Sequence, residues 1–74
     1  MTEDEGLEKR VTGFVLWWDR GQGRGEIIPL GSTDPVLVTR ADLMSASGSL
    51  SADQQVTFTL ALGPTRFEAR DVRP

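Results

Sequence analysis

The residues best suited to chemistry in this chain are two adjacent tryptophans and a group of arginines. Trp17 and Trp18 precede a glycine-rich segment, Gly21-Gln22-Gly23-Arg24-Gly25. Indole rings stack on planar groups such as nucleic-acid bases, and guanidinium groups either stack or hold phosphate oxygens. These residue types predict a ligand-binding site rather than a catalytic site. The candidate binding residues are Trp17, Trp18, Arg20, Arg24, Arg40 and Arg66.

Each of these residues also has a structural interpretation. Adjacent residues of a strand point to opposite faces, so we expect at most one of Trp17 and Trp18 to be fully exposed unless the strand is bulged. The other would be a core ring or a cover on the rim of the domain. Arg24 could be a solvated side chain paired with Glu26. Glu26 itself would repel phosphate from a binding face.

The glycine-rich segment is not typical of a phosphate-binding loop. No Lys-Ser or Lys-Thr pair follows it, and no helix or βαβ unit is predicted after it. We interpret its glycines as positions where strands approach closely or curve sharply.

Composition excludes most catalytic and metal-binding arrangements. The 74 residues include no His and no Cys, which removes the commonest general base, thiolate nucleophiles and Cys-ligated zinc. A chain this short also has few buried positions to spare for an active-site cleft. We expect no enzyme activity, no catalytic residue, no cofactor and no metal.

The charge is distributed unevenly along the chain. The net charge is −3, but Glu3, Asp4, Glu5 and Glu8 account for four of the eleven acids. We expect residues 1–9 to be a disordered acidic leader and residues 10–74 to be one folded domain. No signal peptide or membrane helix is indicated, so we expect a cytoplasmic monomer that does not bind membranes.

The folded part has the pattern of an all-β domain. Apolar residues alternate from Val56 to Leu62 before a Gly63-Pro64 turn, and shorter strands are predicted at residues 24–28 and 36–39. Residues 11–19 form a further strand with apolar residues on both faces, and residues 66–73 form a polar fifth strand. A single helical turn is predicted within residues 40–44. Five short strands in so small a domain favour a closed antiparallel barrel of the OB or SH3-like type.

The order of these residues resembles the cold shock domain family. The resemblance runs over residues 11–73 through Gly13 to Asp19, Gly23 to Pro29, Val36 to Val38, Ser49 to Phe58 and Ala69 to Val72. It implies a five-stranded OB-type barrel that binds single-stranded RNA or DNA as a nucleic-acid chaperone or as a regulator of transcription or translation.

The resemblance is incomplete at the positions where the family stacks bases. Trp17 matches the family's stacking tryptophan, but Arg24 and Glu26 replace two stacking phenylalanines. Leu37 and Arg40 replace two further rings, and Thr39 replaces a histidine. The resemblance therefore implies a cold-shock-like barrel with an altered binding face.

Two functions follow from this altered face. In the first, the domain binds single-stranded nucleic acid weakly, with arginines replacing part of the aromatic platform. In the second, it no longer binds nucleic acid and is a protein-interaction or regulatory module. A mixed patch would then contact a protein partner, made of Leu16, Trp18, Arg24, Glu26, Ile28 and Leu37.

Overall fold

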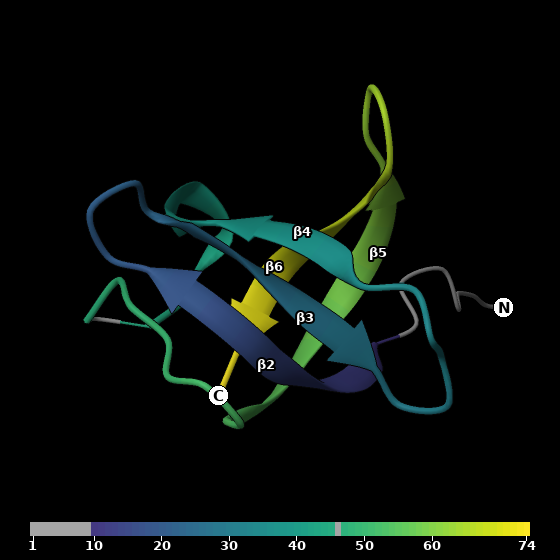
Figure 1. The fold of residues 1–74 in the computed structure, drawn as a ribbon, viewed down its shortest axis with the longest axis horizontal. Helices are drawn as coiled ribbons and strands as arrows, with labels where there is room; N and C mark the ends of the chain where they lie inside the picture. Colours follow the sequence, from purple (N-terminus) through teal and green to yellow (C-terminus); the bar gives the residue numbers. More distant parts are fainter. Residues whose placement is uncertain (1–9, 46) are drawn as a thin grey trace, which may run out of the picture.

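The computed structural model describes residues 10–45 and 47–74, and the predicted acidic leader at residues 1–9 lies outside them. The described chain forms five strands and one 3-10 turn (Figure 1). The elements are β2 (Val11–Asp19), β3 (Arg24–Pro29), β4 (Val36–Thr39), η1 (Arg40–Asp42), β5 (Gln55–Leu62) and β6 (Phe67–Arg73). The all-β prediction and the single helical turn are confirmed. Within the described ranges, no helix is long and apolar enough to span a bilayer.

The strands close into a barrel in the order β2-β3-β4-β6-β5. Figure 1 shows β2, β3 and β4 crossing the near side of the barrel, with β5 and β6 behind them. All neighbouring strands pair in antiparallel fashion except β4 and β6, which pair in parallel through Leu37 and Glu68. Closure leaves few exposed strand edges, which is how a small β domain limits edge-to-edge association.

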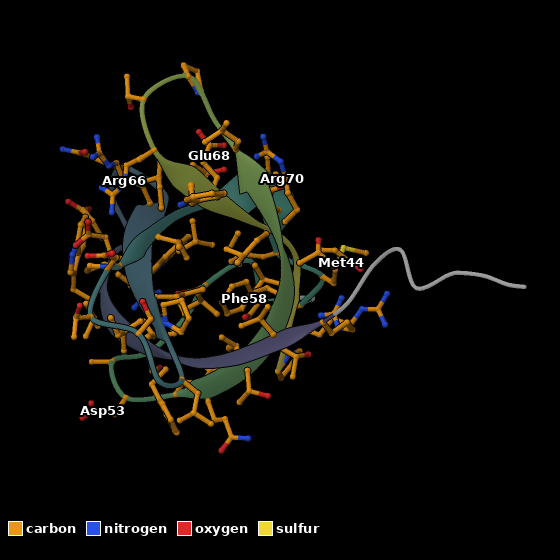
Figure 2. All side chains as sticks on the ribbon, turned by 90° about the vertical axis from the view of Figure 1, so that its right-hand side faces the viewer. Met44, Asp53, Phe58, Arg66, Glu68 and Arg70 are labelled. Atoms are coloured by element: carbon orange, nitrogen blue, oxygen red, sulfur yellow. The ribbon has the colours of Figure 1, made fainter. Side chains whose placement is uncertain are left out.

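Inward-facing residues of all five strands form the core. Phe58 is fully buried and lies inside the ring of strands, whereas Arg66, Glu68 and Arg70 lie around its outside (Figure 2). Burial of such apolar side chains is the main favourable term in folding. The buried apolar residues are Val15, Ile27, Val36, Val38, Leu50, Val56, Phe58, Ala69 and Val72.

A β-bulge in β2 decides which tryptophan faces solvent. Val15 pairs with Ile27, but the next pair joins Trp17 to Glu26, so Leu16 is an extra residue in the ladder. Without the bulge, Trp17 would point inward with Val15, because side chains alternate between the two faces of a strand. The extra residue reverses this alternation. Trp17 therefore faces outward, and Trp18 packs against the core.

Candidate nucleic-acid interface

The candidate site is the outer surface of β2, β3 and β4. The strand register aligns Trp17 with Glu26, Glu26 with Leu37, and Arg24 with Thr39. These five residues define what we call the Trp17 face. On β3 and β4 the alternate residues Gly25, Ile27, Val36 and Val38 are buried, which places the side chains of this face on the outside of the barrel.

Trp17 lies on this face with one ring edge fixed. Its side chain is 39% exposed, and its indole Nε1–H donates a hydrogen bond of 2.8 Å to Oε1 of Glu26. A ring held by its edge keeps its orientation while part of its surface stays accessible. Such a ring can stack on a planar ligand with less loss of side-chain entropy on binding.

Glu26 joins Trp17 to an arginine from a distant part of the chain. Its Oε2 forms an ion pair of 2.7 Å with Nη2 of Arg66, and the same nitrogen donates to the carbonyl oxygen of Pro35 at 2.9 Å. The Glu26 and Arg66 side chains are 23% and 36% exposed, so the pair is only partly screened by water. We refer to these contacts as the Trp17–Glu26–Arg66 chain.

This chain lowers the pKa of Glu26. The hydrogen bond from Trp17 makes the largest contribution, and the hydrogen bond and positive charge of Arg66 act in the same direction, with a smaller effect from the charge of Arg24. Partial burial opposes them. Glu26 is therefore ionised at neutral pH, and its charge is largely compensated within the protein.

The ion pair of Glu26 corrects one structural interpretation made from the sequence. The sequence suggests Arg24 as a partner of Glu26, but the carboxylate pairs with Arg66 and receives only a long-range electrostatic effect from Arg24. Arg24 is exposed at the start of β3. Its guanidinium group is thus available on the Trp17 face.

Trp18 occupies a different environment from Trp17. It is half-buried, packs against the core, and faces Gly25 across the β2–β3 pair. Its indole Nε1 is buried without a hydrogen-bond partner among the described residues. A side chain at position 25 would meet the Trp17 carbonyl and the Trp18 ring, so glycine makes this packing possible. Trp18 thus supports the Trp17 face from inside and contributes little of its own surface to it.

Arg40 and Arg20 meet at the loop that joins β2 to β3. Nη2 of Arg40 donates to the carbonyl oxygen of Arg20 at 2.8 Å, and its backbone N–H donates to the Gly23 carbonyl at 2.9 Å. Gly23 has a φ of +66°, and a Cβ there would lie 2.9 Å from the guanidinium carbon of Arg40. Arg40 thus fixes this loop beside the Trp17 face, and both arginines remain exposed.

The structure brings together only some of the six residues selected from the sequence. Trp17 and Arg24 lie on one face and Arg66 adjoins it, Arg20 and Arg40 meet at the neighbouring loop, and Trp18 is set inward. Sequence reasoning missed the bridging role of Glu26. The signal available was its position opposite Trp17 in a hairpin, but the bulge had to be known to place the two on the same face.

Metal binding has no evident site in residues 10–45 and 47–74. No three His, Cys, Asp or Glu side chains gather there as a metal ion would require. Two acidic residues on or next to the Trp17 face already have hydrogen-bond or ion-pair partners within the protein. Glu26 binds Trp17 and Arg66, and Asp19 accepts a hydrogen bond from the Gln22 backbone.

Comparisons with known proteins identify the fold. No protein-family model matches the chain, and no curated protein sequence matches it. Among solved structures, one described as "drosophila Unr CSD456" superposes with a TM-score of 0.75 at 18% sequence identity. The match covers 90% of this chain and 27% of that one, so this chain spans about a quarter of the length of the Unr structure.

This match bears on function only at the level of the fold. At 18% identity, the match establishes architecture and carries no residue-level role to this chain. The chain therefore has the five-stranded closed barrel of the cold shock domains, as its sequence resemblance predicted.

Proposed function

We propose that this domain binds single-stranded RNA or DNA through the Trp17 face. The observation that carries the proposal is the exposed Trp17 ring, which Glu26 holds by its edge on the outer surface of the barrel. A base would stack on this ring, an interaction of about 1 to 3 kcal/mol per base that tolerates different sequences.

The charges around Trp17 support a weak interaction. Arg24 lies on the same face, and Arg20 and Arg40 lie at the adjacent loop, where they would contact phosphates or stack on further bases. Arg66 compensates Glu26, which reduces the repulsion of phosphate that the sequence predicted. One partly exposed ring and a small number of free cations imply low affinity, and each phosphate contact that an arginine makes adds to the decrease in affinity with salt.

NMR can test the proposal because the two indole N–H groups report on different places. The indole N–H of Trp17 donates a hydrogen bond to Glu26. The indole N–H of Trp18 is buried without a hydrogen-bond partner among the described residues. We would titrate the protein with oligo(dT) and oligo(U) of about eight nucleotides. This length lies within the roughly 4–16 nucleotides that one OB fold contacts. We expect saturable shifts of the Trp17 signal that weaken with salt.

A pair of substitutions separates stacking from folding. Trp17→Ala should weaken binding of a labelled oligonucleotide by about 5- to 150-fold, the equivalent of one stacked base. Trp17→Phe keeps an aromatic ring and should retain most of the affinity. A flat titration at low salt, or equal binding by Trp17→Ala and the native protein, would rule out stacking on this face.

A further inference from the structure

One end of the barrel forms an open apolar pocket that adjoins the Trp17–Glu26–Arg66 chain at Arg66. Its volume is about 410 Å³, and its apolar lining is made of Pro29, Pro35, Val36, Leu60 and Phe67, with Ser32, Asp34 and Arg66 completing the lining. We call this pocket the barrel mouth. Its volume lies within the roughly 300–1,000 Å³ of typical ligand pockets, so it can admit a side-chain-sized group but not a folded domain.

The mouth exists because the β5–β6 pair extends beyond the closed part of the barrel. Val56 and Phe58 of β5 are buried, whereas Leu60 and Leu62, which continue the same alternation, are 44% and 75% exposed. Phe67, paired with Leu62 on β6, is 53% exposed. In Figure 1 the β5–β6 connection projects from the body of the barrel.

Exposed apolar residues gathered around a pocket are unusual on a small protein. Scattered apolar residues need no explanation, but a contiguous apolar patch indicates an interaction site. Here Leu60 and Phe67 come from two paired strands and line the pocket, and Leu62 pairs with Phe67. Aromatic residues such as Phe67 are enriched in interfaces between proteins.

The charges at the rim of the mouth indicate which partner fits. Arg66 reaches the rim, but its guanidinium group already pairs with Glu26. Asp34 also lies on the rim, and its backbone N–H and carbonyl oxygen form hydrogen bonds with the Ser32 hydroxyl. The Asp34 carboxylate has no hydrogen-bond or ion-pair partner among the described residues. Among residues 10–45 and 47–74, the rim therefore carries the negative charge of Asp34 without an ion-pair partner. It disfavours phosphate and favours a cation beside an apolar group.

We propose that the barrel mouth binds an extended segment of another protein, inserting an apolar side chain that is adjacent to a Lys or Arg. The apolar side chain fills the pocket against Phe67 and Leu60, and the cation lies against Asp34. This site adjoins the Trp17 face through Arg66 but would take a different ligand, so the domain would carry two neighbouring binding surfaces.

A short peptide pair tests the proposal directly. The probe is acetyl-Gly-Leu-Arg-Gly-amide, and acetyl-Gly-Leu-Glu-Gly-amide is its charge-reversed match. We would record amide NMR spectra of the full chain at increasing peptide concentration. We expect saturable shifts at Val36, Leu60 and Phe67 with the Arg peptide, and weaker binding of the Glu peptide. Acetyl-Gly-Ala-Arg-Gly-amide, which lacks the apolar group, should give no saturable shift.

Three variants make the test specific to the mouth. Phe67→Ser should abolish the shifts, whereas Met44→Ser, at an exposed apolar residue outside the pocket wall, should not. Asp34→Asn should weaken the Arg peptide by about two- to fivefold, the effect of one exposed ion pair, and remove its advantage over the Glu peptide. Neither Phe67→Ser nor Asp34→Asn should reduce oligonucleotide binding at the Trp17 face.

Several outcomes would overturn the proposal. These are absence of saturable shifts with the Arg peptide, equal binding of the Arg and Glu peptides, or shifts confined to the Trp17 face. A molecular mass that rises with concentration and returns to the monomer value in Phe67→Ser would mean that a second copy of this chain occupies the mouth. Oligonucleotide shifts at Val36 and Phe67 would assign the mouth to nucleic acid instead.

Discussion

Substituting Glu26 with Gln tests whether the Trp17–Glu26–Arg66 chain limits nucleic-acid binding. The amide oxygen of Gln can still accept the hydrogen bond from Trp17, so the ring keeps its position. The negative charge is lost, and Arg66 is released from its 2.7 Å ion pair. Arg66 would then be free to contact a phosphate.

The expected gain is modest and can be estimated. Two unit charges 4 Å apart in water interact by about 1 kcal/mol, so one released phosphate contact should tighten binding by about fivefold. One additional phosphate contact to a single strand also steepens the slope of log K against log salt by about 0.7. Between 50 and 200 mM salt, Glu26→Gln should therefore lose about 2.5-fold more affinity than the native protein.

The cost to folding should be small. Both partners of the ion pair are partly exposed, and exposed pairs contribute about 0–1 kcal/mol. In a domain of this size, 1 kcal/mol changes the Tm by about 4–8 °C. A melting curve by circular dichroism should show a decrease no larger than this.

The assay is fluorescence polarisation of a labelled oligonucleotide at four or more salt concentrations. Asp71→Asn serves as a control, because it also removes one acid from an ion pair but lies against Arg10 and Arg73, away from the Trp17 face. We expect tighter oligonucleotide binding and a steeper slope of log K against log salt in Glu26→Gln, and neither change in Asp71→Asn. Unchanged or weaker binding by folded Glu26→Gln would refute the idea that Glu26 restrains Arg66.

Two further predictions concern the support of the Trp17 face and its response to acid. Gly25→Ala should destabilise the domain by several kcal/mol, because the added Cβ would meet the Trp17 carbonyl and the Trp18 ring. Gly21→Ala should cost far less stability, because its Cβ would meet only the Asp19 side chain at 3.3 Å. Denaturant unfolding compares the two, and equal stability would contradict this account of the packing. Because the folded-state pKa of Glu26 is lowered, its contribution to stability is present above its ordinary pKa and is lost as pH falls through the folded value. The Trp17 indole N–H signal should accordingly titrate with a midpoint below the ordinary glutamate pKa, and a midpoint at or above that value would show that the hydrogen bond and ion pair do not hold the charge.

Much of the architecture follows from local sequence patterns. Alternation from Val56 to Leu62 and the Gly63-Pro64 turn predict strands close to those observed. Strand content and small size together favour a closed barrel. The family resemblance then distinguishes the OB type from the SH3-like type. The one departure is the parallel pairing of β4 with β6, which depends on how the chain closes rather than on any local pattern.

The site was less accessible to sequence reasoning. The sequence determined that Trp17 and the arginines were the residues able to stack and bind phosphate, because those capacities belong to the side chains themselves. The tertiary structure decided where they lie and which of them share a face. The bulge at Leu16 turned Trp17 outward and Trp18 inward, and barrel closure brought Arg66 to Glu26 from forty residues away in the chain. Alternation gives the relative direction of neighbouring side chains only while the ladder is regular, and no local pattern encodes which distant strand closes the barrel.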